Sequence, residues 1–173
     1  SFPNILIIEK EQKFGQHISS RNSEVIHSGI YYPKNSLKRK LCITGNNLLY
    51  QFIKKYDLPF LNCGKLIVAS DEKEEVDLHK LLFNAKNNNI KGVKIVSSKE
   101  AKNIEPNVKC LSALWVPSSG IMDSHKIMQR LEYNFISHDG IISYNTKVDN
   151  IDYKNRKYII EINETDWTFI IHL

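Results

Sequence analysis

The sequence predicts an α/β fold, and three observations carry this prediction. A continuous apolar run at residues 5–8 is rich in Ile and has the pattern of a strand buried on both faces of a parallel sheet. A polar loop and an amphipathic helical pattern follow this run. The chain then alternates strand and helix patterns before a final series of strands, which is typical of α/β proteins.

Helices are predicted from apolar spacing and capping residues. Ser36 is a suitable N-cap for a helix reaching about residue 56, because apolar side chains recur there every three or four positions. Gly45 is unfavourable inside a helix and suggests close packing against another part of the chain. Two capping boxes, Asp71 with Glu74 and Ser97 with Glu100, open the next two helices.

The last helix and the strands complete the predicted order. The helix begins at residue 123 or 124 and ends at Gly140, which is expected at the C′ position. Hairpin turns are expected at residues 154–155 and 164–166. The predicted strands after the first are residues 65–69, 93–96, 111–116, 141–144, 147–153, 157–163 and 167–173.

Composition indicates an ordinary globular protein. The apolar fraction is 42% and the charged fraction 25%, which argues against disorder. No apolar run approaches the roughly 20 residues that span a bilayer and no leader is visible, so we expect a cytoplasmic protein without a transmembrane segment. The three cysteines are widely spaced and predict reduced thiols, and no His/Cys/Asp/Glu grouping has metal-ligand spacing.

Chemistry is expected in the stretch at residues 17–41. It combines hydroxyl and amide side chains with His, Arg and Tyr, next to apolar residues that include Ile26 and Ile30. Such side chains donate hydrogen bonds to anionic oxygens, and a turn can add backbone N–H groups. The stretch therefore predicts a site for a phosphate-bearing aromatic cofactor. From the residues alone, an ordinary Ser/Asn-rich turn remains the alternative.

Four segments resemble one enzyme family in order and composition. These segments are NILIIEKE, SSRNSEVIHSGIYY, SLKRKLC and CGKLIVA. They resemble the FAD-dependent oxidoreductases of the D-amino-acid oxidase type, and in particular the L-2-hydroxyglutarate dehydrogenase/oxidase family. The resemblance extends from residue 5 to about residue 152.

The resemblance implies a partial FAD/NAD(P)-binding, Rossmann-like domain interrupted by a mixed α+β substrate domain. Residues 1–56 and 123–173 would form the incomplete FAD-binding domain, and residues 57–122 part of the substrate-binding domain. It also implies FAD as cofactor. The implied reaction is oxidation of a small 2-hydroxy acid such as L-2-hydroxyglutarate by hydride transfer to the flavin.

Site residues follow partly from the local sequence and partly from the same resemblance. His27 would lie near the isoalloxazine in a confined space and act as the catalytic base, the alternative being a buried histidine with satisfied hydrogen bonds. Lys65 would bind a substrate carboxylate, although a charged residue at a strand start is usually solvated. Tyr31 and Tyr32 would line the substrate cavity, or else pack in the core. The residues expected to bind the cofactor are Glu9 at the ribose, Lys10 beside the adenosine, and Ser19, Ser20, Asn22 and Ser23 along the pyrophosphate and ribityl.

One feature of this family is absent from the sequence. A dinucleotide fold uses G-x-G-x-x-G between its first strand and helix to bring pyrophosphate close to backbone N–H groups, and the motif does not occur here. We therefore expect a chain truncated at both ends and inactive alone. The alternative is an inactive remnant that is non-catalytic or self-associating, such as a homodimer formed through exposed strand edges.

A basic nucleic-acid-binding module is the third hypothesis. The net charge of +5 comes from 20 Lys and only 4 Arg, and the lysines are spread along the chain. Nucleic-acid binders more often cluster their cations on one face and use Arg for bidentate contacts. We therefore expect no nucleic-acid partner.

Overall fold

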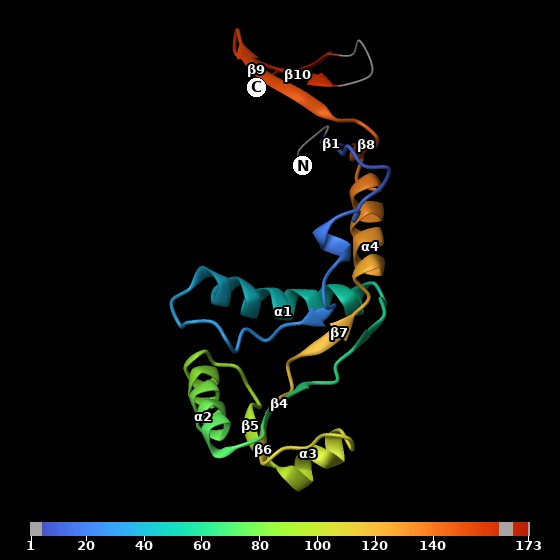
Figure 1. Ribbon diagram of the computed structural model, residues 1–173. Helices are drawn as coiled ribbons and strands as arrows, with labels where there is room; N and C mark the ends of the chain where they lie inside the picture. Colours follow the sequence, from blue (N-terminus) through green and yellow to red (C-terminus); the bar gives the residue numbers. More distant parts are fainter. Residues whose placement is uncertain (1–4, 163–167, 173) are drawn as a thin grey trace. The chain divides into compact units, whose positions relative to one another are not determined.

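The computed structural model describes residues 5–162 and 168–172, which form helices and strands mixed along the chain (Figure 1). The chain divides into two compact units. Unit 1 consists of Ser1–Asn22 and Ser124–Leu173, and unit 2 consists of Ser23–Asp123. The mixed α/β class is as predicted. The assignment of residues 57–122 to substrate binding is a functional one and stays a prediction.

Unit 1 contains the first predicted strand. β1 (Leu6–Ile8) pairs in parallel with β8 (Ile141–Ser143), as the apolar run indicated. The expectation of burial on both faces is wrong for the described residues, because Ile5 and Ile7 are 46% and 44% exposed. The physical reason is that, in the described part of the chain, β1 belongs to a sheet of only two strands, with β8 as its partner.

Helix α4 (Ser124–Ile136) starts where predicted but ends differently. The left-handed residue after the helix is Asp139, with φ of 64°, and not Gly140. Gly140 still has a structural reason, because a Cβ there would overlap the ring of Phe135. Its amide donates to the Phe135 carbonyl oxygen over 3.0 Å. The glycine therefore makes room for an aromatic ring and does not supply the backbone conformation.

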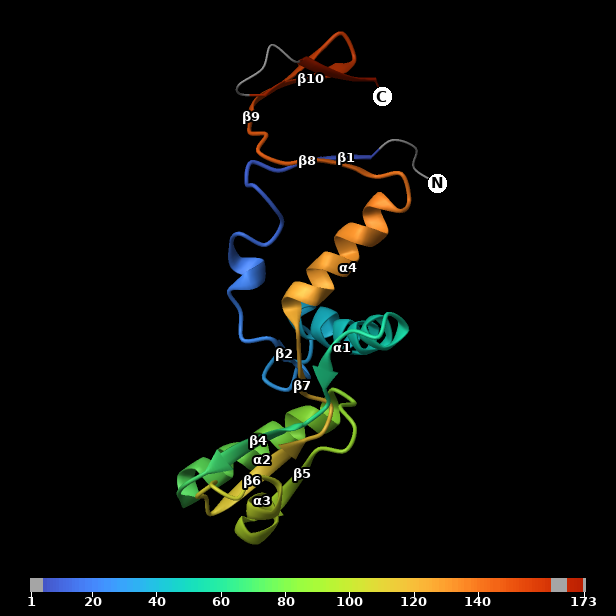
Figure 2. The same ribbon diagram turned by 90° about the vertical axis from the view of Figure 1, so that its right-hand side faces the viewer.

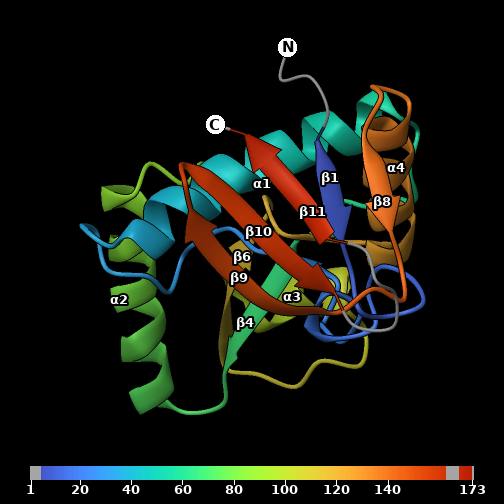
Figure 3. The same ribbon diagram turned by 90° about the horizontal axis from the view of Figure 1, so that it is seen from above.

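The last strands of unit 1 form an antiparallel sheet in the order β11-β10-β9 (Figure 3). The turn between β9 and β10 uses Asn155 and Arg156, with φ of 53° and 60°, one residue later than predicted. Positive φ at both positions matches the twist of a two-residue hairpin. The predicted turn at residues 164–166 lies outside the described residues. The strands are β9 (Val148–Lys154), β10 (Lys157–Ile162) and β11 (Thr168–His172).

Unit 2 contains a small sheet that the sequence pattern did not reveal. Its order is β2-β7-β3, and every pairing is antiparallel. Gly120 lies within the central strand, where a Cβ would meet the Tyr50 hydroxyl and the carbonyl oxygen of Leu61. Strands this short have no readable alternation. They are β2 (Val25–Ile26), β3 (Phe60–Leu61) and β7 (Gly120–Met122).

Helix α1 (Leu37–Lys55) begins as predicted, with the Ser36 hydroxyl accepting from the Arg39 amide over 3.2 Å. Its apolar face is less buried than the spacing indicated. Leu41 and Leu48 are 60% and 58% exposed, although Ile53 is fully buried. Hydrophobic periodicity thus located the helix but not its buried face.

Gly45 in α1 provides a stability prediction. We expected close packing there, but a Cβ would meet nothing within 4 Å. Gly45→Ala should therefore stabilise the protein by about 0.5–1 kcal/mol, since alanine favours the helix and no neighbour opposes it. Urea unfolding of the two proteins measures this difference. A loss of stability would show that a neighbour does contact this position.

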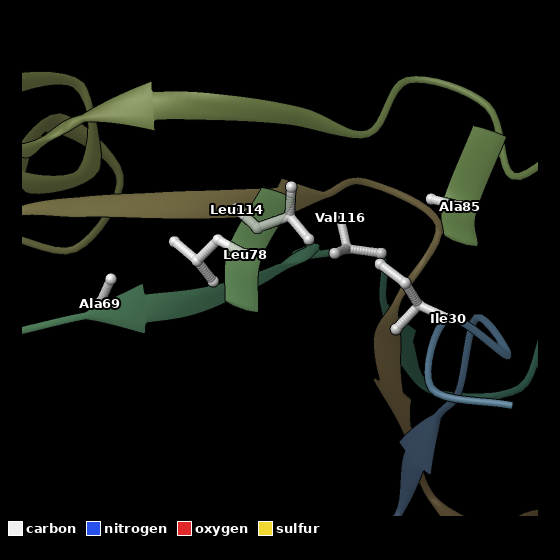
Figure 4. Packing of buried hydrophobic residues seen from close by; sticks show 6 residues of the cluster. All are labelled: Ile30, Ala69, Leu78, Ala85, Leu114 and Val116. Carbon is white, nitrogen blue, oxygen red and sulfur yellow. The ribbon is translucent and has the colours of Figure 1, made fainter. Parts of the chain in front are cut away.

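The main core of unit 2 lies between α2 and a second antiparallel sheet, in the order β4-β6-β5 (Figure 2). Both predicted caps are present: Asp71 accepts from the Glu74 amide, and Ser97 with Glu100 forms a full capping box. Figure 4 shows the core cluster of Ile30, Ala69, Leu78, Ala85, Leu114 and Val116. The elements are β4 (Lys65–Ala69), α2 (Glu72–Asn87), β5 (Lys94–Ser97), α3 (Ser98–Ile104) and β6 (Ser112–Val116).

Within residues 5–162 and 168–172, no helix combines the length and apolarity needed to cross a bilayer. The same part of the chain contains no group of three or more His, Cys, Asp or Glu side chains placed to hold a metal ion.

Candidate functional site

Unit 1 carries the acidic residue predicted to bind ribose. Glu9 directly follows β1, at the carboxyl end of a parallel strand, where α/β folds bind ligands. Its amide donates to the Ser143 carbonyl oxygen over 2.9 Å, and its Oε1 accepts from the Glu11 amide over 3.0 Å. The backbone is thus fixed, and no described residue hydrogen-bonds to Oε2. Lys10 is exposed, with its Nζ 3.8 Å from a Glu11 oxygen.

The polar loop that follows contains a short 3-10 helix, η1 (Ile18–Ser20). The Ser20 hydroxyl donates to the His17 carbonyl oxygen over 3.1 Å, and the Asn22 amide donates to the Ser19 carbonyl oxygen over 2.8 Å. Two of the predicted cofactor residues therefore use their side chains to shape the turn itself. The Ser19 side chain is exposed. These contacts are those of a Ser/Asn-rich turn, and cofactor binding by this loop stays a prediction.

The predicted catalytic residue, His27, directly follows β2 in unit 2. Its neighbours Ile26 and Ser28 are 2% and 5% exposed, so the backbone is anchored on both sides. His27 itself is exposed and its ring is only partly covered, which corrects the expectation of a confined ring. In an extended segment, neighbouring side chains point to opposite faces, and the buried pair at 26 and 28 leaves residue 27 on the open face.

The backbone at His27 is held by a residue that sequence reasoning missed. The Asn46 side-chain amide donates to the His27 carbonyl oxygen over 3.0 Å and to the Ser118 carbonyl oxygen over 2.9 Å. Asn46 therefore connects α1 to the segments after β2 and after β6. The only sequence signal was a polar residue within an apolar helical pattern.

Three of the predicted substrate residues form cation-aromatic contacts in unit 2. The Lys65 ammonium donates to the Tyr31 hydroxyl over 3.3 Å and lies 4.5 Å from the centre of the Tyr31 ring. Lys38 lies in the same way over the ring of Tyr32, at 4.6 Å. The two tyrosines thus do not pack in the core as a pair, and Lys65 is not a purely solvated strand start.

The charges of Lys65 and Lys38 also act on His27. The pKa of His27 is lowered from its ordinary value, first by partial burial and then by the positive charges of Lys65 and Lys38. A lowered pKa keeps the imidazole neutral near pH 7, and only a neutral imidazole accepts a proton. We call His27, Tyr31, Tyr32, Lys38 and Lys65 the lysine-tyrosine cluster.

Removing one lysine tests this coupling. Lys65→Gln should raise the His27 pKa towards 6.5, because a like charge that disfavours the imidazolium is lost, while partial burial keeps the value below 6.5. NMR titration of the His27 ring protons measures the change. The matched control is Lys99→Gln, an exposed lysine on α3 that does not contribute to the His27 shift. An unchanged His27 pKa in Lys65→Gln would contradict the coupling.

Ser23 lines a cavity of about 470 Å³ at the edge of the small sheet. The cavity is walled largely by apolar residues, with Ser23, Glu24 and Asp123 as its polar members. An apolar cavity with few polar groups is typical of sites for flat organic ligands. Its other lining residues are Pro59, Phe60, Leu61, Ile121 and Met122.

Comparison with known proteins identifies the class of protein. The family model described as FAD dependent oxidoreductase, DAO, matches residues 2–171. The chain belongs to this family of FAD-dependent oxidoreductases. The predicted family, fold class and cofactor class are thereby confirmed.

Among curated proteins, the chain is similar to L-2-hydroxyglutarate dehydrogenases. It is 43% identical over 127 residues to the mitochondrial enzyme of Arabidopsis thaliana, covering 73% of this chain and 26% of that protein. It is 37% identical over 161 residues to the mitochondrial enzyme of Caenorhabditis briggsae, covering 92% of this chain and 37% of the relative. The chain thus spans between about a quarter and two fifths of these relatives.

Solved structures show the same fold. The L-alpha-glycerophosphate oxidase of Mycoplasma pneumoniae, solved with FAD bound, matches 93% of this chain and 44% of its own, with a TM-score of 0.84 and 26% identity. Glycine oxidase from Geobacillus kaustophilus matches 96% of this chain and 46% of its own, with a TM-score of 0.81. At 18% identity, the second match supports the fold alone.

Proposed function

We propose that this chain carries the substrate end and part of the FAD site of a dehydrogenase that oxidises a small 2-hydroxy acid, L-2-hydroxyglutarate being the first candidate. Family membership supports the reaction class, and the names of the similar curated proteins support the substrate. The observation that carries the proposal is the lysine-tyrosine cluster, in which Lys65 contacts Tyr31. The pKa of His27 is lowered there first by partial burial and then by the charges of Lys65 and Lys38.

The residues present fit FAD in chemical type. Glu9 offers a carboxylate oxygen at the end of a parallel strand, which suits a ribose hydroxyl. The cavity beside Ser23 is mainly apolar and suits an aromatic ring system. In this proposal Glu9 and Lys10 contact the adenosine, and Ser19, Ser20, Asn22 and Ser23 contact the pyrophosphate and ribityl. Bound FAD supplies the acceptor for the hydride that leaves carbon 2 of the substrate.

In this proposal the residues of the lysine-tyrosine cluster bind the substrate and accept its proton. The Lys65 ammonium and the Tyr31 hydroxyl bind a substrate carboxylate, the first as a charged donor and the second as a neutral one. Tyr32 lines the same side, with its ring held under Lys38. Neutral His27 takes the proton from the substrate hydroxyl as carbon 2 loses its hydride, so the product is a 2-oxo acid.

A substrate panel tests the proposal. Because the chain lacks the glycine fingerprint, the test uses this chain joined to a fingerprint segment of the family, here called the joined protein. Supplied with FAD and an artificial electron acceptor, the joined protein should oxidise L-2-hydroxyglutarate faster than L-2-hydroxybutyrate, which lacks the second carboxylate. The D-enantiomer of 2-hydroxyglutarate is the matched control for stereochemistry. Equal rates with all three acids would contradict the assigned substrate. Oxidation of an amine substrate, with no oxidation of the three acids, would contradict it as well.

A second candidate function rests on exposed apolar surface. Apolar side chains are exposed in two places of the described chain: at Ile5 and Ile7, around and within β1, and at several leucines of α1. Such exposure favours association with another copy. In this alternative the chain is a non-catalytic, self-associating remnant. Light scattering tests it, because a monomer at all concentrations excludes the homodimer.

The cytoplasmic location also stays a proposal. The similar proteins of Arabidopsis thaliana and Caenorhabditis briggsae are named mitochondrial. Fractionation of the source cells distinguishes the two locations.

A further inference from the structure

A second cavity in unit 2, of about 290 Å³, has no role in the proposed reaction. None of its lining residues is among the predicted cofactor or substrate residues. The lining comes from the segment after β2, from α1, from the loop after α2 and from the turn after β6. Its residues are Ser28, Ile43, Asn46, Asn47, Asn89, Ile90, Lys91 and Ser118.

Two hydroxyl groups at this cavity are buried without a partner. Ser28 is 5% exposed, and its Oγ has no hydrogen-bond partner within the described protein. The Oγ of Ser118 is likewise buried and unpartnered. A buried hydroxyl without a hydrogen bond costs about 1–3 kcal/mol, so such groups usually have a ligand or water as partner. Both groups therefore point to a polar occupant.

The rest of the lining defines the charge of that occupant. Lys91 is exposed at the cavity, and no carboxylate among the described residues lies within ion-pair distance of it. The Asn47 amide makes one bond, to the Ile43 carbonyl oxygen over 3.3 Å, and retains further donor capacity. One cation with hydroxyl and amide donors suits an oxyanion carrying a single charge.

We infer that this cavity binds a small organic carboxylate. The carboxylate oxygens accept from Lys91 and from the hydroxyls of Ser28 and Ser118, and a short hydrocarbon body contacts Ile43 and Ile90. The two apolar lining residues, Ile43 and Ile90, favour this class over inorganic phosphate, which has no apolar part and carries more charge than one lysine balances. The inference does not rest on the proposed reaction.

Butyrate is the probe, and NMR titration of the chain is the measurement. Saturable one-to-one binding should shift the amide signals of Ser28, Asn47 and Lys91. Lys91→Gln should weaken binding by about tenfold or more, because a charged donor is lost. Lys86→Gln, at the exposed last turn of α2 and outside the cavity lining, is the matched control and should leave the affinity unchanged. Equal affinity in Lys91→Gln, or no saturable shift, would overturn the inference.

A second variant keeps the test independent of folding. Ser118→Ala removes a hydroxyl that has no partner, so the fold should be retained while butyrate binding weakens. Inorganic phosphate should bind more weakly than butyrate, and tighter phosphate binding would overturn the assignment to carboxylates. Lys65→Gln should leave butyrate binding at this cavity intact. If Lys65→Gln alone abolished binding, this inference would fail while the proposed function stood.

Discussion

Replacing His27 by Gln is expected to lower kcat/KM for L-2-hydroxyglutarate by roughly 10²- to 10⁴-fold, the usual contribution of a positioned general base. Gln retains a polar side chain but cannot take the hydroxyl proton. Because the His27 side chain is exposed, the protein should keep its stability. Steady-state kinetics of the joined protein, with and without the substitution and at equal flavin content, measures the effect. His79→Gln, an exposed histidine on α2, is the matched control and should keep full activity.

The pH profile separates a catalytic role from a structural one. The His27 pKa is lowered, so the active, neutral form dominates above that value and is lost as the pH falls through it. The acid limb of kcat/KM should therefore lie below pH 6.5 in the unmodified protein and disappear in His27→Gln. A variant that retains both its rate and its acid limb would contradict the assignment of His27 as base.

Gly64→Ala is expected to destabilise the protein by about 3 kcal/mol, summing left-handed backbone strain and overpacking. Gly64 has φ of +69°, and its Cβ would overlap the ring of Trp115. Its amide donates to the Ser119 carbonyl oxygen over 3.0 Å, so the backbone cannot move freely. Urea unfolding measures the loss.

Gly45→Ala is the matched control for Gly64→Ala, because the same change there meets open space. Adding Trp115→Leu to Gly64→Ala should recover only the part of the loss caused by the ring, since the positive φ remains. A loss below about 0.5 kcal/mol in Gly64→Ala, the range of ordinary surface changes, would show that the turn adapts.

Local chemistry explains which elements the sequence could predict. Ser36, Asp71 and Ser97 cap their helices as expected, because a cap needs only residues within one turn. The small β2-β7-β3 sheet was missed, since its strands are too short to alternate and pair residues 60 to 96 positions apart, such as Leu61 and Val25 with Ile121. Sheet partners at such separation are a tertiary property.

The candidate site was also predicted only where the local sequence or the family resemblance determines it. The family resemblance named Tyr31 and Lys65, which do lie in contact, but neither the periodicity nor the motif predicted that Lys65 would lower the His27 pKa. Asn46, which holds the His27 carbonyl oxygen, was not predicted because it lies 19 residues along the chain, on the next helix. The exposure of His27 depends on which neighbours are buried, and that too follows from the folded structure.

Anaerobic reduction of bound FAD is the decisive experiment for the proposed dehydrogenase. The joined protein, supplied with FAD, is mixed with L-2-hydroxyglutarate in the absence of oxygen, and the visible absorption band of the flavin is followed with time. We expect this band to bleach, and to bleach much more slowly in His27→Gln at equal FAD occupancy. Bound FAD that stays oxidised with L-2-hydroxyglutarate, or that bleaches equally fast without His27, would contradict the proposed function.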